Sequence, residues 1–162
     1  MLSSGINFIK FKTKTKNLLV KKNLQSILKE KNQIIESLSR NYKNNFSTRQ
    51  LKKYQKYLNL RVIGMGGSIL GTHAIYDFLK DKIKKNFLFI DNLQPNSRKN
   101  LKKNFTNIIV SKSGNTIETI VNSNILIKNK NKNIFITEDK KNYLHLLAKK
   151  LKAEIIHHNN YI

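Results

Sequence analysis

Short runs of apolar residues alternate with longer amphipathic segments along the chain from residue 60 onward. The runs are rich in Ile, Val and Phe and are too short for helices, so they predict buried strands. The segments between them carry apolar residues at three- and four-residue spacing, which predicts helices. Strands are expected at 60–64, 87–91, 107–111, 133–137 and 153–157, and helices near 68–84, 96–104, 116–129 and 139–151. This alternation predicts an α/β fold, a three-layer α-β-α sandwich with a mostly parallel five-stranded sheet.

The first 58 residues follow a different pattern. Leucines and isoleucines recur at helical spacing between residues 17 and 40, so one helix is expected there. A second helix is expected from Ser47, which suits an N-cap, with Gln50 completing a capping box. We therefore predict two domains, a helical N-terminal lead-in over residues 1–58 and an α/β domain over residues 59–162.

The first sixteen residues are basic and contain no acid, a composition that resembles an organellar transit peptide. Ile6 and Phe8 nevertheless alternate with polar neighbours, which favours an exposed edge strand. We adopt the second interpretation and predict a cytoplasmic protein. No apolar stretch of the sequence approaches the roughly 20 residues needed to span a bilayer, so no membrane partner is expected.

The chain carries a formal net charge of +23 over 162 residues. Such a surplus is typical of nucleic-acid-binding proteins. Here it comes almost entirely from lysines distributed along the whole chain, whereas arginine leads in specific base contacts. We therefore expect a solvated lysine surface that attracts anions in general, phosphorylated molecules included, and no nucleic-acid partner. The absence of cysteine excludes disulfides and thiolate metal sites.

The first expected strand is followed by a glycine-rich turn, Gly64-Met65-Gly66-Gly67-Ser68. Such a turn suggests a dinucleotide-binding fold, but the third glycine of that fingerprint is replaced by Ile69. The P-loop is excluded too, because no Lys-Ser/Thr pair follows Gly71. What remains is a tight turn that brings backbone close to a ligand, with Ser68 at the helix N-terminus. The alternative is a purely structural turn in which Ser68 is an ordinary N-cap.

A second turn, Ser111-Lys112-Ser113-Gly114-Asn115-Thr116, joins the third expected strand to a helix. Unpaired N–H groups at a helix N-terminus attract phosphate, and hydroxyl groups donate to its remaining oxygens. An N-cap needs one hydroxyl and this turn has three, although Ser and Thr are also common in loops without a ligand. Because parallel strands place their carboxyl ends on one edge, both turns are expected to lie there. Together they predict a phosphorylated ligand.

Other candidate chemical groups are few. Glu118 and Glu138 lie close to strand ends and are candidates for acid–base groups, but an acid in the first turn of a helix commonly complements the helix dipole. No nucleophile–base pair and no metal-spaced cluster is recognisable in the sequence. We therefore assign no catalytic residue and no metal ligand.

Both turns, with the spacing between them, resemble the N-terminal sugar-isomerase (SIS-type) domain of the glucose-6-phosphate isomerase family. Residues 62–71 are similar to the family's G-x-G-G-S-x-x-G turn, and residues 110–119 to its S-K-[TS]-x-x-T-x-E-T loop. The resemblance covers about residues 60–158 and implies a flavodoxin-like sheet. It implies a phosphate-binding set and a sugar-lining set. The first set is Ser111, Lys112, Ser113 and Thr116, and the second is Gly66, Gly67 and Ser68.

The family interconverts glucose 6-phosphate and fructose 6-phosphate in glycolysis and gluconeogenesis, with a glutamate base and no metal or organic cofactor. The resemblance implies this activity, a phosphosugar partner and a homodimer. In the family, however, the catalytic glutamate, histidine and lysine lie beyond the first SIS domain, and this chain ends at Ile162, about where that domain ends. We therefore expect a truncated chain or a stand-alone half that binds the phosphosugar.

Two further hypotheses stay open. A non-catalytic or regulatory SIS-domain protein also fits, because Ser113-Gly114 is compatible with the S-x-S-G-x-T loops of other SIS proteins. A nucleotide-binding or nucleic-acid-binding α/β protein is the third hypothesis, and it rests on the basic surface.

Overall fold

The computed structural model of the protein describes residues 17–93 and 104–161. The chain divides into two compact units, one up to Tyr42 and one from Lys43 onward. The first unit contains helix α1 (Leu18–Lys29) and helix α2 (Gln33–Ser37). The edge strand predicted within residues 1–16 lies outside the described residues, as does the helix predicted near 96–104 apart from Asn104.

The prediction of a single helix over residues 17–40 is wrong, because two helices occupy this stretch. Glu30, after α1, has extended backbone angles. Asn32 then caps α2 by accepting a hydrogen bond from the Ile34 N–H at 2.8 Å. An asparagine side chain that bonds to nearby backbone competes with a continuous helix, which explains the break.

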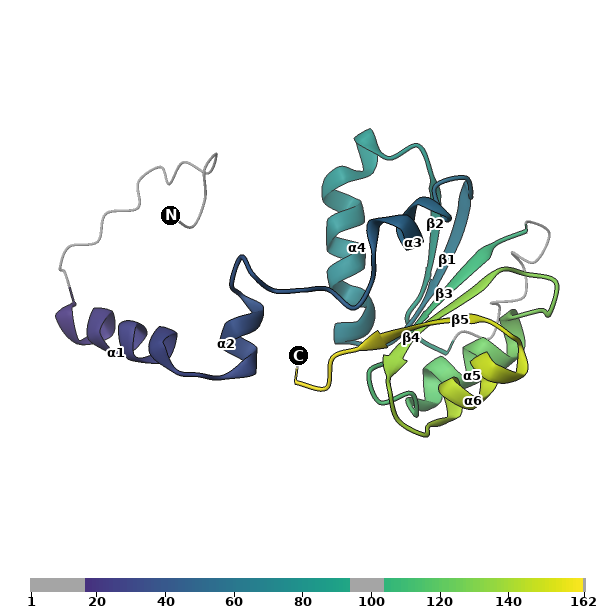
Figure 1. Ribbon diagram of the computed structural model, residues 1–162. Helices are drawn as coiled ribbons and strands as arrows, with labels where there is room; N and C mark the ends of the chain where they lie inside the picture. The colour runs from purple at the N-terminus through teal and green to yellow at the C-terminus, as the bar shows by residue number, and fades with distance from the viewer. Residues whose placement is uncertain (1–16, 94–103, 162) are drawn as a thin grey trace. The chain divides into compact units, whose positions relative to one another are not determined.

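Five strands form one sheet in the second unit. They are β1 (Asn59–Ile63), β2 (Asn86–Ile90), β3 (Thr106–Val110), β4 (Asn133–Glu138) and β5 (Glu154–His158). Their spatial order is β2-β1-β3-β4-β5, and every neighbouring pair is parallel (Figure 1). Each strand begins and ends within one residue of its predicted range. The predicted α/β class and five-stranded parallel sheet are confirmed.

Helix α3 (Thr48–Lys52) begins with the predicted capping box between Ser47 and Gln50. The connections between strands hold α4 (Gly67–Leu79) with the short helix η1 (Lys80–Lys82), then α5 (Ile117–Leu126) and α6 (Tyr143–Lys150). The helix predicted at 139–151 begins later than expected. Asn142 takes its N-cap position and accepts a hydrogen bond from the His145 N–H, so residues 139–142 stay outside the helix.

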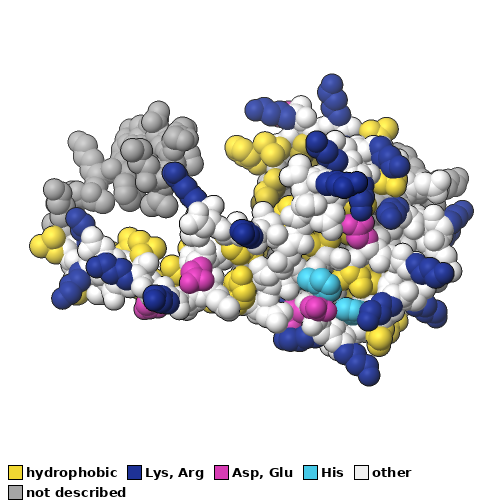
Figure 2. Space-filling model, viewed as in Figure 1, with side chains coloured by type: hydrophobic (Ala, Val, Ile, Leu, Met, Phe, Trp, Pro, Cys, Tyr) yellow, Lys and Arg dark blue, Asp and Glu magenta, His cyan; other side chains and the backbone are white. Residues whose placement is uncertain are grey.

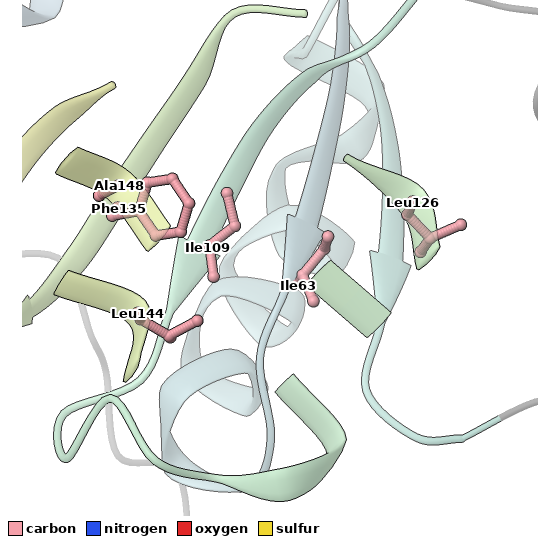
Figure 3. Packing of buried hydrophobic residues seen from close by; sticks show 6 residues of the cluster. All are labelled: Ile63, Ile109, Leu126, Phe135, Leu144 and Ala148. Atoms are coloured by element: carbon pink, nitrogen blue, oxygen red, sulfur yellow. The ribbon is translucent and has the colours of Figure 1, made fainter. Parts of the chain in front are cut away.

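Helices cover both faces of the sheet, with α4 on one side and α5 and α6 on the other (Figure 1). The main buried cluster lies between the sheet and the second pair of helices. Figure 3 shows its members, Ile63, Ile109, Leu126, Phe135, Leu144 and Ala148. On the opposite face, the ring of Tyr76 from α4 packs against Phe87 and Phe89 of β2. Burial on both faces holds the carboxyl ends of β1 and β3 rigidly, and both turns of interest begin there.

Positive charge is widely distributed on the face of the molecule seen in Figure 2, where lysine and arginine side chains lie over many elements. On that face the charge is not gathered over a single helix or strand, which is the pattern of a solvated surface. No described helix combines the length and the apolar character needed to cross a bilayer.

Candidate functional site

The turn after β3, residues 111–116, is closed by its own hydroxyl groups. Ser111 is almost fully buried, and its Oγ accepts a hydrogen bond from the Gly114 N–H at 3.2 Å. The same oxygen lies 3.1 Å from Oγ1 of Thr116, so these two hydroxyls share a hydrogen bond. Ser113 is exposed, and its Oγ accepts from the Asn115 N–H at 3.3 Å. The turn therefore presents hydroxyls at both a buried and an exposed position.

Helix α5 begins directly after this turn, with Thr116 at its N-cap. The Thr116 side chain makes no capping hydrogen bond, because its hydroxyl pairs with Ser111 instead. In the described part of the chain, no side chain accepts a hydrogen bond from the first turn of α5. The N–H groups there, with the partial positive charge of the helix end, are therefore available to an anion.

The glycine-rich turn after β1 is built from backbone alone. Gly66 occupies the N-cap of α4 with φ 53° and ψ −129°, and no side chain caps this helix. The structural interpretation of Ser68 as the N-cap is therefore wrong, because Ser68 is the second residue of the helix. Gly66 and Gly67 are exposed, and Ser68 is half-buried. The backbone of Gly66 and Gly67 is therefore exposed, with no side chain covering it.

The two turns lie side by side. β1 and β3 are hydrogen-bonded neighbours, with Ile63 opposite Ile109. At the next position, a Cβ on Gly64 would lie 3.0 Å from the carbonyl oxygen of Val110, so the ends of these strands touch. Each turn leads into a helix on a different face of the sheet, as Figure 1 shows. This is the place where the strand order reverses direction, and ligands of open parallel sheets bind at such a point.

Residues of the β4–α6 connection hold the hydroxyl-bearing turn in place. The Lys112 carbonyl accepts from the Glu138 N–H at 3.0 Å and from Thr137 Oγ1 at 3.3 Å. The Gly114 carbonyl accepts from the Leu144 N–H at 3.1 Å, and Asn115 Oδ1 accepts from the Tyr143 N–H at 3.0 Å. From the sequence, Glu138 was a candidate acid–base group, and a supporting role was predicted for neither Thr137, Tyr143 nor Leu144.

Glu138 is a paired carboxylate at the end of β4. Lys140 Nζ lies 2.9 Å from its Oε2, and this hydrogen bond lowers the pKa of Glu138, with the charges of Lys112 and His158 adding to the effect. Burial opposes this shift without reversing it. An acid whose pKa is lowered stays ionised at neutral pH, so Glu138 is poorly suited to donating a proton. Its carboxylate neutralises part of the positive charge around the turn.

The predicted site residues differ in how the structure places them. Ser111, Ser113 and Thr116 come together in one turn, and Lys112 is half-buried beside Glu138. Among residues 17–93 and 104–161, no group of three or more His, Asp or Glu side chains is arranged to hold a metal ion. One residue could have been found from the sequence, because Asn142 before an apolar helical pattern is an N-cap signal.

Three curated relatives match a large part of the chain. The glucose-6-phosphate isomerase of Methanocaldococcus jannaschii is 45% identical over 102 residues, 54% of this chain and 25% of that protein. That of Borrelia garinii subsp. bavariensis is 41% identical over 98 residues, 54% of this chain and 18% of that protein. That of Acholeplasma laidlawii is 37% identical over 124 residues, 65% of this chain and 28% of that protein. No family model matches the chain.

The chain is similar to part of these glucose-6-phosphate isomerases, at 37–45% identity over the matched residues. It spans between 18% and 28% of the length of these three family members. Among solved structures, a hypothetical protein from Thermus thermophilus superposes with a TM-score of 0.60 at 20% identity, over 70% of this chain and 31% of that protein. At that identity the likeness supports the fold alone, a parallel α/β sheet.

Proposed function

We propose that residues 59–162 form a SIS-type domain and carry the phosphosugar-binding site of an isomerase that interconverts glucose 6-phosphate and fructose 6-phosphate. The observation that carries this proposal is the adjacency of the two turns. They begin side by side, because Gly64 lies against the carbonyl oxygen of Val110, the last residue of β3. They do so in a chain whose relatives are named glucose-6-phosphate isomerase.

In this proposal, the turn at 111–116 holds the phosphate. The first-turn N–H groups of α5 point to the anion, and the hydroxyls of Ser113 and Thr116 donate to its oxygens. Ser111 keeps Thr116 in place through their shared hydrogen bond. The half-buried Lys112 adds positive charge, which strengthens the attraction for a dianion.

The sugar then lies over the glycine-rich turn. Gly66 and Gly67 are exposed and have no side chain, so a hexose can approach their backbone closely. Ser68, half-buried in the first turn of α4, is placed to contact a sugar hydroxyl. Anchoring the phosphate at one turn and the sugar at the other fixes the orientation of the carbons between which a proton would move. No residue of the chain is assigned to that proton transfer.

Two further parts of the proposal, a homodimer and independence of metal or organic cofactors, are expected from the resemblance. A cytoplasmic location is proposed from the composition of the N-terminal residues. The helical lead-in is proposed over residues 1–58, and its residues from Lys43 onward belong to the same compact unit as the sheet. Sedimentation equilibrium of the purified chain tests the homodimer. For a dimer with a dissociation constant of about 1 μM, chain concentrations from one to a hundred times that value cover the range in which the dimer predominates.

A thermal-shift titration tests the site. Glucose 6-phosphate and fructose 6-phosphate are expected to raise the melting temperature of the chain, whereas glucose is not. In a Ser111→Ala/Thr116→Ala variant the shift is expected to vanish, because the Thr116 hydroxyl and the Ser111 hydroxyl that holds it are both lost. The loss of one hydrogen bond to a charged phosphate costs roughly 1.5–3 kcal/mol of binding free energy. Ser123→Ala is the matched control. The Ser123 hydroxyl is buried on α5, the helix that follows the turn, and it has no hydrogen-bond partner in the described residues.

The outcomes separate the hypotheses. Stabilisation by RNA or NAD but not by either sugar phosphate would overturn the proposal in favour of a nucleotide-binding or nucleic-acid-binding protein. Stabilisation by an aminosugar phosphate in preference to both hexose phosphates would favour a SIS protein of different specificity. Equal stabilisation of the double variant and the wild type would place the phosphate somewhere other than this turn.

A further inference from the structure

Asn142 is a buried residue with contacts on three sides. Its Oδ1 accepts a hydrogen bond from the His145 N–H at 2.8 Å, which caps α6, and its Nδ2 donates to Thr137 Oγ1 at 3.2 Å. Its amide also lies directly against the α-carbon of Gly114, because a Cβ built on Gly114 would overlap Oδ1 and Cγ of Asn142. One side chain therefore links the start of α6, the end of β4 and the turn at 111–116.

The contacts of Asn142 reach the turn at two points. Through Thr137, it is connected to the Lys112 carbonyl, which accepts from Thr137 Oγ1 at 3.3 Å. Through direct packing, it limits the position of Gly114, which has φ 67°. Lys112 and Gly114 flank Ser113, so Asn142 constrains the backbone on both sides of that residue. A turn held in this way loses less conformational entropy when a ligand binds.

We propose that Asn142 is a positioning residue for the phosphate turn. It acts through Gly114 and Thr137 and does not touch the ligand itself. The amide of Asn142 holds the Lys112–Gly114 backbone in the conformation in which the Ser113 hydroxyl faces the anion. This inference rests on the proposed function of the turn, and it assigns a role to a residue that the family motifs do not include.

Replacing Asn142 with serine distinguishes a positioning role in the phosphate turn from a purely structural role in capping α6. Asn142→Ser keeps an excellent N-cap for α6 but removes the amide that packs on Gly114 and reaches Thr137. Asn17→Ser is the matched control, because Asn17 caps α1 with the same Oδ1 contact and belongs to the other unit. Both variants of the full chain are compared with the wild type by amide hydrogen exchange and by titration with glucose 6-phosphate.

In Asn142→Ser, the N–H of Gly114, which is hydrogen-bonded to Ser111, is expected to exchange about tenfold faster, while the capped N–H of His145 is unchanged. The dissociation constant for glucose 6-phosphate is expected to rise about tenfold, and in Asn17→Ser neither quantity moves. A reciprocal test uses Gly114→Ala. The drop in melting temperature that it causes is expected to be smaller in the Asn142→Ser background, because the overlapping amide is gone.

Failure of this inference is distinguishable from failure of the proposed function. If the wild type does not bind glucose 6-phosphate, the proposed function is overturned, and the exchange rates still decide whether Asn142 holds the turn. If the wild type binds and Asn142→Ser binds equally well with unchanged exchange at Gly114, the positioning role is overturned. Equal effects of Gly114→Ala in both backgrounds would overturn the packing contact on which the role depends.

Discussion

The two turns at the carboxyl edge of the sheet hold their shape in different ways. Each contains one glycine with positive φ, 53° at Gly66 and 67° at Gly114. A Cβ on Gly66 would meet nothing within 4 Å, whereas a Cβ on Gly114 would overlap the amide of Asn142. The glycine-rich turn is open to its surroundings. The hydroxyl-bearing turn is closed by side chains from a neighbouring connection.

This difference matches the two tasks in the proposed function. A phosphate is small and highly charged, and its recognition depends on donors held at fixed positions. Ser111 and Gly114 are buried and the turn is hydrogen-bonded to α6, which supplies that rigidity. A hexose is larger and needs room, which Gly66 and Gly67 leave. Packing therefore serves one half of the site and open space serves the other.

The largest difference in stability between the two turns is expected when each positive-φ glycine is replaced by alanine. Gly114→Ala should destabilise the fold by about 3 kcal/mol, because a strained backbone and a steric overlap add together. Gly66→Ala should cost only about 1–2 kcal/mol, because strain acts alone there. Denaturant unfolding of both variants measures the difference. Equal losses would mean that both turns depend on backbone conformation to the same degree.

The next largest effect is expected at the point where the turns touch. Gly64→Ala places a Cβ 3.0 Å from the Val110 carbonyl oxygen, a backbone atom that cannot move independently of the sheet. We expect a loss of about 1–2 kcal/mol in unfolding free energy from this overpacking. Gly71→Ala is the control, because its Cβ would meet nothing within 4 Å.

In that control, alanine in the interior of α4 should stabilise the helix by up to about 1 kcal/mol, since glycine is the weaker helix former. Urea midpoints of the two variants should therefore move in opposite directions from the wild type. A Gly64→Ala protein as stable as the wild type would show that the strand ends tolerate separation, and the close contact of the two turns would lose its importance.

The positions and boundaries of the strands along the chain could be predicted because short apolar runs and turn residues are local signals. The position of both turns on one edge could also be predicted, since parallel strands share a carboxyl edge. The break between α1 and α2 was missed because the apolar spacing runs on through it, and only the Asn32 side chain ends the pattern. Local competition of this kind leaves little trace in periodicity.

Contacts between distant segments were beyond the reach of the sequence. Nothing near Gly114 indicates that Asn142 will lie against it, since 28 positions and a whole strand separate them. Arg61 is a second example, a charged residue inside an apolar strand. Its guanidinium is buried, bonds to Asn107 and to the Leu126 carbonyl at the end of α5, and lies over the Phe105 ring. Each partner comes from another segment, so tertiary contact alone explains the burial.

Acidity should affect the two turns differently, because Glu138 lies beside only one of them. Its pKa in the folded chain is lowered from 4.5, so the carboxylate contributes stability that is present above about pH 4.5 and lost as the pH falls through the folded value. Acidification below about pH 4.5 should lower the protection of amides against hydrogen exchange, relative to their intrinsic rates, in residues 111–116 before it does so in residues 64–68.

Glu138→Gln isolates this contribution. The variant should be less stable than the wild type at pH 7, and the two stability curves should approach each other below about pH 4.5, as the pH falls through the folded pKa of Glu138. Glu36→Gln, at an exposed position on α2, serves as the control and should leave the curve nearly unchanged. Curves for Glu138→Gln and the wild type that stay parallel from pH 7 to pH 3 would show that the Lys140 pair adds nothing to folding.

The smallest effect on stability is expected from Ser113→Ala, yet this variant tests most directly what the hydroxyl-bearing turn is for. Ser113 is exposed, and its one hydrogen bond, to the Asn115 N–H, is long at 3.3 Å. Its removal should change the unfolding free energy by less than about 0.5 kcal/mol.

If the Ser113 hydroxyl donates to a phosphate, the affinity of the Ser113→Ala variant for glucose 6-phosphate, measured by calorimetry, should fall about tenfold, because a charge-assisted hydrogen bond is lost. The substitution would then weaken binding while leaving the unfolding free energy nearly unchanged. An affinity equal to that of the wild type would remove Ser113 from the binding set and leave Thr116 as the hydroxyl that donates to the phosphate.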